Sequence, residues 1–510
     1  MSKYETVIGL EVHAELATKT KIFCGCINEF GGEVNTHTCP ICTGQPGALP
    51  VLNKKVVEYA IKAGLATNCE ITPLGKQDRK NYFYPDLPKA YQISQSDLPI
   101  CTNGFVEIDT PEGLKQIGLT RIHIEEDAGK LLHDDYGNTL VDYNRGGVPL
   151  IEIVSEPDMR SAEEAKEFLE SLKAILETTG VSDCKMQEGS LRCDVNVSLR
   201  PHGQAEYGTR AEMKNVNSFS AAYRAIKFEE KRQTEILEAG EEVAQETRRW
   251  DDEKGKSFLM RSKEDAQDYR YFPEPDLVGI KIDEAWIEEI RKTLPELPKA
   301  KFARFMSKYN LPEYDARLIS SSKKLSELLD DAAALGANPK AVANWLLGDI
   351  SKEVNDRELE HNDIPFGAQH LADMIALIEN GKISNTAGKK VVEALFARRG
   401  DGPPSPAGDR DGRPYEPANS PTSVGGGVPD APLPPVEKIV EELGLLQISD
   451  DSALLAIVKE TLAANPQSVS DYKGGKTNAF GFLVGQCMKV SGGKGNPQKF
   501  NELLKSELDN

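Results

Sequence analysis

The sequence predicts an α+β protein in which a mixed or antiparallel β domain with helices is followed by an all-α domain and a small all-α tail. Segments of alternating apolar and polar residues fill the first 294 positions, and a helical period replaces them from Pro295. A Pro/Gly-rich segment then precedes a last helical stretch. At 510 residues the chain is also long enough for several domains.

The composition narrows the possible functions before any motif is considered. The chain is 39% hydrophobic and 28% charged and has no apolar run of about 18 residues, so we expect no contact with a membrane. The N-terminus lacks the charged and apolar zones of a signal peptide, which predicts a cytoplasmic protein. The net charge of −20 argues against a general DNA-binding protein and confines contact with nucleic acid to local basic patches.

Two strong helices stand among the strand-like segments of the first domain, residues 1–294. The first is expected from Ser161, where Ser161 and Glu164 have the spacing of a capping box, to about Gly180. The second is expected from about Ser218 to Gly240.

Several predicted strands carry polar residues on one face. In residues 8–16 the even positions are apolar, whereas Glu11, His13 and Glu15 occupy the opposite face. Residues 191–199 and 210–214 show the same alternation, and residues 120–127 and 150–156 add more carboxylates. The polar positions of these later segments include Arg192, Asp194, Asn196, Arg210, Glu212, Lys214, Glu125, Glu126 and Glu152.

This polar face has two interpretations. An antiparallel sheet with one solvated face gives the same alternation without any function. Solvated faces usually carry Thr, Ser and Lys, whereas Glu, His, Asp, Asn and Arg are the groups that hold Mg²⁺ and phosphate. If the faces line one concavity, we expect a metal and nucleotide site.

The chain has no phosphate-binding loop of the Walker type. Gly475-Lys476-Thr477 resembles the end of such a loop, but Ser470 stands where the leading glycine is required. ATP would therefore be held by the sheet and by helix N-termini such as the one expected after Asn217 and Ser218. A simple helix cap explains those two residues equally well.

Four cysteines have the spacing of a metal site. Cys24-Gly25-Cys26 is followed after twelve residues by Cys39-Pro40-Ile41-Cys42, which suits a tetrahedral zinc held by four thiolates. Four protein ligands leave no open position, so the zinc would be structural. Reduced thiols without a metal are the alternative. The other five of the nine cysteines are expected to be small buried side chains.

The second half of the chain is expected to be helical. Residues 295–398 form the predicted helical domain, and residues 436–510 the tail. Between them, residues 401–435 hold ten Pro and six Gly and have too few apolar groups for a core, which predicts a disordered linker. The tail carries the candidate RNA-binding lysines Lys473, Lys476, Lys489, Lys494 and Lys499, although a solvated helical face would look the same.

Long stretches of the chain resemble a known family. Residues 4–16, 79–86, 89–95, 123–129, 150–158, 188–196, 214–219, 269–276 and 445–504 resemble the B subunits of the aspartyl/glutamyl-tRNA amidotransferases. Only residues 401–435 depart from the family pattern, as an insertion would. Two of the matching motifs also look alike, Tyr82-Phe83-Tyr84-Pro85-Asp86 and Tyr271-Phe272-Pro273-Glu274-Pro275-Asp276, but two copies make no repeat architecture.

The resemblance implies a cradle-shaped catalytic domain, a helical domain and a tail that touches tRNA. It also implies two partners: an amidase that frees ammonia from glutamine, and a small third protein that braces the pair to give a heterotrimer. ATP and Mg²⁺ would phosphorylate the side-chain carboxylate of a misacylated glutamyl- or aspartyl-tRNA, and ammonia would then amidate it. By resemblance His13, Glu125 and Glu152 would hold the metal, with Glu11, Glu126, Asp194, Asn196 and Lys214 near the ATP, metal or intermediate.

Two other functions stay open at this point. The chain could be a non-catalytic tRNA-binding scaffold in which the polar faces only stiffen the sheet. It could also be an independent ATP-dependent ligase that joins free ammonia to a small amino acid. ATP consumption that depends on charged tRNA separates both from the amidotransferase.

Overall fold

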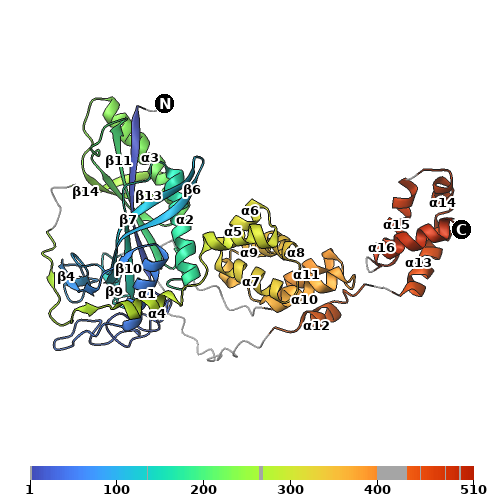
Figure 1. Ribbon diagram of the computed structural model, residues 1–510, viewed down its shortest axis with the longest axis horizontal. Helices are drawn as coiled ribbons and strands as arrows, with labels where there is room; N and C mark the ends of the chain where they lie inside the picture. The colour runs from blue at the N-terminus through green and yellow to red at the C-terminus, as the bar shows by residue number, and fades with distance from the viewer. Residues whose placement is uncertain are drawn as a thin grey trace. The chain divides into compact units, whose positions relative to one another are not determined.

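The protein has the predicted α+β fold, seen here in a computed structural model (Figure 1). The structure describes residues 3–134, 136–262, 268–398, 433–447, 450–476, 478–492 and 495–509. These residues fall into two compact units, the first ending at Ala300 and the second beginning at Lys301. Within the described residues, no helix is long and apolar enough to cross a membrane.

A mixed sheet forms the frame of the first unit. Among the described residues it has nine strands in the order β14-β13-β12-β11-β1-β10-β7-β6-β2. All neighbours are antiparallel except β12 and β13. The strands are β1 (Tyr4–Glu15), β2 (Glu70–Ile71), β6 (Cys101–Thr110), β7 (Gly113–Glu126), β10 (Pro149–Ser155), β11 (Leu191–Pro201), β12 (Ala211–Val216), β13 (Glu246–Asp251) and β14 (Lys256–Ser262).

Helices cover the apolar face of this sheet. The even positions of β1, such as Leu10 and Val12, are almost fully buried and share one core with Phe168 and Ile226 from two of the helices. The odd positions of β1 are left on the opposite face, so the predicted alternation separates core from site. The helices are α1 (Lys54–Ala66), α2 (Ala162–Thr179), α3 (Phe219–Glu238) and α4 (Glu284–Arg291).

The two helices predicted in this unit begin and end almost where expected. Ser161 Oγ accepts a hydrogen bond from Glu164 N (3.1 Å), and Gly180 ends α2 in the left-handed conformation (φ 71°). The other half of the predicted capping box differs, because the Glu164 carboxylate accepts from Arg160 N (2.7 Å). Ser218 Oγ accepts from Ala221 N (3.0 Å), so the helix-cap interpretation of Ser218 is correct.

Three small sheets complete the first unit. One is three-stranded, in the order β15-β4-β5, with β15 (Phe272–Pro273), β4 (Asp78–Asn81) and β5 (Tyr91–Ser94). The other two are the pairs β16 (Ile280–Lys281) with β3 (Leu74–Gly75), and β8 (Lys130–His133) with β9 (Thr139–Asp142).

The second unit is helical, as predicted. Leu325, Leu328 and Leu329 are buried, and Asn338 caps a helix whose first residue is Pro339. Leu454, Leu483 and Phe500 belong to a separate core in the tail. The helices are α5 (Pro298–Tyr309), α6 (Glu313–Ser320), α7 (Lys323–Ala334), α8 (Pro339–Trp345), α9 (Ser351–Asp356), α10 (Ala368–Glu379), α11 (Asn385–Ala397), α12 (Val436–Glu442), α13 (Asp451–Ala464), α14 (Pro466–Lys473), α15 (Asn478–Val490) and α16 (Pro497–Asp509). Between α8 and α9, Leu346–Ile350 forms a π-turn, and residues 401–432 of the predicted linker lie outside the described residues.

Candidate functional site

Strand register assembles a polar cluster in the middle of the large sheet. His13 of β1 lies opposite Glu152 of β10, and Glu152 lies opposite His123 of β7. Directly opposed residues on one face of antiparallel strands have Cβ atoms about 4.5–5.5 Å apart, so these side chains must meet. Glu125 is two residues beyond His123 and shares its face.

Two imidazoles and two carboxylates alternate in this cluster. His13 Nε2 lies 3.4 Å from Glu125 Oε1 and 3.4 Å from Glu152 Oε2. His123 Nε2 lies 3.2 Å from Glu152 Oε2 and 3.7 Å from Glu125 Oε2. The side chain of Glu125 is only 3% exposed, whereas that of His13 is 22% exposed. Glu125 therefore lies at the buried end of the cluster, and solvent or a ligand can reach the cluster at His13.

The electrostatics of the cluster follow from this alternation. Burial alone would raise the pKa of Glu152, but hydrogen bonds from the two imidazoles outweigh it and hold this pKa well below its usual range. For His123 the signs are reversed: burial lowers its pKa, but its contacts with Glu125 and Glu152 outweigh burial and raise this pKa to about 9. The same two carboxylates raise the pKa of His13 against its burial. The site is thus built to hold positive charge between two carboxylates.

The donor set fits a divalent cation. His13, Glu125 and Glu152 each offer one ligand atom, and these atoms all lie within 4.8 Å of one another. Carboxylate oxygens are the usual ligands of Mg²⁺, and the imidazole adds a donor that Mn²⁺ and Zn²⁺ also accept. Such a cation would replace protons on the imidazoles, so its affinity should rise with pH.

His123 is the member of this cluster that was missing from the residues predicted as ligands. It lies in the acidic segment 120–127, two residues before Glu125, and the period of two could have placed it on the same face. Its Nδ1 is buried and has no hydrogen-bond partner among the described residues. Ser94, whose Oγ donates to Glu125 Oε2 (3.4 Å), had no signal in the sequence because it comes from the separate sheet of β5.

A second polar cluster lies beside the first on β1, β11 and β12. Glu11, Asp194 and Glu212 offer ligand atoms within 4.8 Å of one another. Asn196 Nδ2 donates to Glu11 Oε1 (3.0 Å), and Lys214 Nζ contacts Asp194 Oδ2 (2.5 Å) and Glu212 Oε1 (2.8 Å). Burial raises the pKa of Glu11 and lowers that of Lys214, but Asp194 and Glu212 raise the pKa of Lys214 above its ordinary value. This cluster joins four of the predicted site residues, with Glu212 as its further member.

Three other predicted residues have side chains that make no hydrogen bond or ion pair with these two clusters among the described residues. Glu126 points away from Glu125, because adjacent residues of a strand face opposite sides, and it accepts from Lys89 Nζ (2.7 Å) and Ile93 N (2.9 Å). Arg192 contacts Asp127 Oδ2 (2.5 Å) through Nη2. Arg210 precedes β12, is exposed, and has no hydrogen bond or ion pair to the clusters within the described residues.

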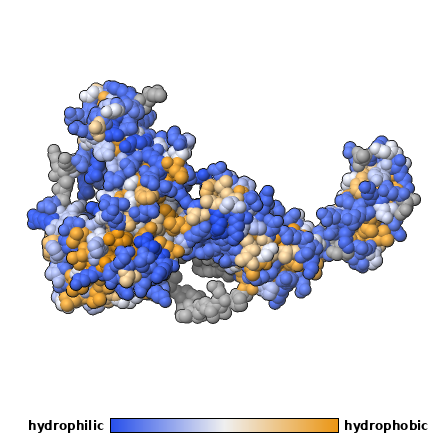
Figure 2. Space-filling model, viewed as in Figure 1, coloured by the Kyte–Doolittle hydropathy of each residue, from blue (hydrophilic) through white to orange (hydrophobic). Residues whose placement is uncertain are grey.

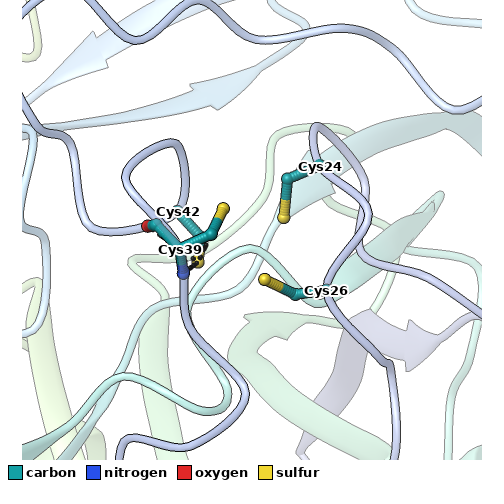
Figure 3. Close-up of side chains that lie close together, drawn as sticks. All are labelled: Cys24, Cys26, Cys39 and Cys42. Atoms are coloured by element: carbon teal, nitrogen blue, oxygen red, sulfur yellow. Dashed lines mark hydrogen bonds between the residues drawn. The ribbon is translucent and has the colours of Figure 1, made fainter.

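The four predicted zinc ligands converge from two loops. Figure 3 shows Cys24 and Cys26 on one loop facing Cys39 and Cys42 on the other. All four sulfurs lie within 4.8 Å of one another, and those of Cys39 and Cys42 are 3.9 Å apart. Thiolates bound at about 2.3 Å to a tetrahedral zinc are about 3.8 Å apart, so the group fits that ion. A hydrogen bond from Cys24 also lowers the pKa of Cys42 to about 4, which favours the thiolate.

The lysines of the tail form a weaker basic surface than the sequence suggested. Lys476 Nζ pairs with Asp471 (3.1 Å) and Lys499 Nζ with Asp451 (2.6 Å), two acids that lie outside the basic segment. Lys473 and Lys489 are exposed near the ends of α14 and α15. Lys494 lies outside the described residues.

Comparisons with known proteins agree over almost the whole chain. A family profile described as GatB/GatE catalytic domain matches residues 6–288, and another described as GatB domain matches residues 327–508. The chain is 57% identical over 511 residues to the B subunit of the aspartyl/glutamyl-tRNA(Asn/Gln) amidotransferase from Caldicellulosiruptor bescii, a match that covers 99% of both proteins. It is 56% identical to the protein of the same name from a Thermoanaerobacter species, with 99% of each covered, and 55% identical to that of Lachnoclostridium phytofermentans, with 100% of this chain and 99% of the relative covered.

Proposed function

The chain belongs to the family of aspartyl/glutamyl-tRNA(Asn/Gln) amidotransferase B subunits, and on that premise we propose that it phosphorylates and then amidates the side-chain carboxylate of a misacylated tRNA. The substrate would be glutamyl-tRNA(Gln), aspartyl-tRNA(Asn) or both. The observation that carries the proposal is the buried cluster of His13, Glu125 and Glu152 beside the cluster of Glu11, Asp194 and Lys214. Together they offer a cation site next to groups suited to a nucleotide.

The proposed reaction explains why ATP is needed. A carboxylate is a poor electrophile because oxide would have to leave. Transfer of the γ-phosphoryl group of ATP to the carboxylate oxygen gives an acyl phosphate and ADP. Ammonia then attacks the carbonyl carbon, phosphate leaves, and the amide forms. Mg²⁺ bound at the site would neutralise charge on the phosphates as the phosphoryl group is transferred.

The residues divide this work between the two clusters. His13, Glu125 and Glu152 would hold the cation. The pairing of β1 with β10, and of β10 with β7, places the three side chains on one face of the sheet. Asp194, Asn196 and Lys214 would contact ATP, since Lys214 is held in place by two carboxylates and can share its protons with a phosphate. Arg192, fixed by Asp127, lies directly opposite His13 and could bind the same anion. Glu126 and Arg210 would act from outside the clusters.

The chain would work in a complex with an amidase and a small third protein. The partner amidase would release the ammonia, because the Ser320-Ser321-Ser322-Lys323 segment offers no nucleophile assembly: Ser322 Oγ caps α7 by accepting a hydrogen bond from Leu325 N (3.3 Å). Exposed apolar side chains, including Phe30, Leu49 and Val51, lie on the loops around the cysteine cluster. Figure 2 shows apolar residues gathered on the first unit, and such surfaces are typical of protein interfaces. Zinc would fix the shape of these loops. We also expect the protein in the cytoplasm, where translation takes place.

The assay that tests the function uses the complex reconstituted with the amidase and the small third protein. ADP release and amide formation are measured with glutamyl-tRNA(Gln), aspartyl-tRNA(Asn) and the same tRNAs without an amino acid. We expect both products with at least one charged tRNA and neither with uncharged tRNA. ATP cleavage that is absent with every charged tRNA would leave only a tRNA-binding scaffold. Amidation of a free amino acid would instead indicate an independent ligase.

We predict that residues 401–435 are dispensable for catalysis. Their composition cannot supply a packed core, so replacing them by a short Gly/Ser link should leave turnover and tRNA binding within about a factor of two. Limited proteolysis of the intact chain should cut first in this segment. A deletion variant that fails to fold would show that the segment has a structural role.

A further inference from the structure

The two similar tyrosine motifs meet in the small sheet of β15, β4 and β5. Phe272 of β15 lies opposite Arg79 of β4, so the segment after β4 and the segment before β15 are brought side by side. The ring centroids of Tyr82 and Tyr269 are 5.7 Å apart, and those of Tyr269 and Tyr271 are 6.2 Å apart, both edge to face. The result is a row of three tyrosines that the proposed reaction does not yet use.

Lys80 projects into this row of tyrosines. Its Nζ lies 4.9 Å from the ring centroid of Tyr269 and 5.7 Å from that of Tyr82. Cations over tyrosine faces are stabilised by the ring quadrupole, so the position is favourable even where water is scarce.

Lys80 differs from the basic residues around it in having no carboxylate partner. Lys76 pairs with Asp78 (2.6 Å), Arg79 with Glu274 (2.6 Å) and Lys89 with Glu126 (2.7 Å). No carboxylate forms an ion pair with Lys80 in the part of the chain that the structure describes. A half-buried ammonium without an anionic partner is costly unless a ligand provides one.

The sheet of β4 and β5 sets Lys80 beside the cation cluster. Lys80 lies opposite Gln92 of β5, and Gln92 Nε2 donates to Glu126 O (2.7 Å) at the end of β7. Burial lowers the pKa of Lys80, but the combined effect of Glu125, Glu152 and the neighbouring tyrosines raises it above its usual value, so the ammonium is charged at neutral pH. Ser94, which shares a face of β5 with Gln92, donates to Glu125 Oε2 (3.4 Å), so this face of the small sheet is turned toward the cluster.

We propose that Lys80 binds the anionic side chain of the aminoacyl group, first as a carboxylate and then as an acyl phosphate, and holds it over the His13–Glu125–Glu152 cluster; this inference rests on the proposed function. The two carboxylates of the cluster are balanced by its imidazoles or by a bound cation, so the cluster alone has little net charge to attract an anion. Lys80 supplies that attraction, and its compact ammonium can follow the change from carboxylate to phosphate because it does not require one planar partner. The partly buried rings of Tyr82 and Tyr269 would limit the access of water to the acyl phosphate, which water would otherwise hydrolyse.

The test compares Lys80→Met, which keeps the aliphatic stem, with Lys80→Arg, which keeps the charge. Lys166→Met on α2 is the control, because it removes the same charge from an exposed side chain. In the full complex, Lys80→Met should lower kcat/KM for charged tRNA by about tenfold to a hundredfold, the usual effect of losing a hydrogen bond to a charged group. The Kd for uncharged tRNA and the Tm should stay unchanged, and Lys80→Arg should recover part of the loss.

Two results would overturn the proposal for Lys80. One is a kcat/KM of Lys80→Met equal to that of the wild type and of Lys166→Met. The other is a parallel loss of Tm and of uncharged-tRNA binding in both Lys80 variants, which would assign the residue a structural role. If the wild-type complex itself fails to cleave ATP with charged tRNA, the proposed function fails, and the inference falls with it for that separate reason.

Discussion

Replacing Glu125 by Gln should lower tRNA-dependent ATP cleavage by at least about a hundredfold, the size expected for the loss of a metal ligand. The substitution preserves shape and most hydrogen-bonding capacity but removes the charge that would hold the cation. The carboxylate is buried and lies 3.4 Å from His13 Nε2, so no solvent-exposed group can take its place. ADP release from the complex in the presence of charged tRNA is the measurement.

The controls for Glu125→Gln separate this effect from loss of folding and from the partner amidase. Glu170→Gln makes the same change on the exposed face of α2 and should leave the rate unchanged. Glutamine hydrolysis by the partner should be much less affected than ATP cleavage, and free ammonia should not restore amidation. Normal ATP cleavage by both Glu125→Gln and His13→Ala, in a complex that binds charged tRNA, would rule out this cluster as the phosphorylation site.

Removing one cysteine of the zinc site should have the second large effect. The wild-type chain should contain about one Zn, and Cys39→Ser should contain much less, because the apparent binding energy of structural zinc, about 10–16 kcal/mol, depends on all four ligands. Because zinc binds the folded chain, its binding energy also stabilises the fold. The Tm should therefore fall by a few degrees for about every 2 kcal/mol lost from the free energy of unfolding. Elemental analysis and thermal melting measure the two quantities.

A cysteine outside the cluster provides the matched control for Cys39→Ser. Cys69 is half-buried near Thr67, in the connection between α1 and β2, and is not among the four clustered cysteines, so Cys69→Ser should keep the zinc content of the wild type. A chelator should reproduce the lower Tm of Cys39→Ser in the wild-type protein and have little effect on the variant. Full zinc occupancy after removal of three of the four cysteines would contradict the site.

The parts of the fold that depend on neighbouring residues could be predicted from the sequence. The ends of α2 follow from Ser161 and Gly180, because the cap bonds and the left-handed turn involve only residues a few positions away. The polar face of β1 follows from its period of two in the same way.

The parts that depend on strand order and register could not be predicted. His13 and His123 join one cluster only because β10, which carries Glu152, lies between β1 and β7, and no local pattern encodes that order. The same limit applies to the tail, where Asp451 from α13 pairs with Lys499 although no acid stands within the basic segment. Arg210 lies one residue before the start of β12, where the alternation of a strand no longer fixes the direction of a side chain.

The place of β1 in the sheet has a consequence for synthesis of the chain. It is synthesised well before its two neighbours, β10 and β11, which begin at Pro149 and Leu191. At about 5–20 residues per second, this strand waits roughly 7–30 s for β10 and roughly 10–40 s for β11. Contacts such as Leu10 with Ser155 and Glu11 with Asn196 span 145 and 185 positions, so closing them costs entropy before any contact is gained. The strand that carries Glu11 and His13 is therefore exposed to mispairing in the nascent protein until its neighbours are made.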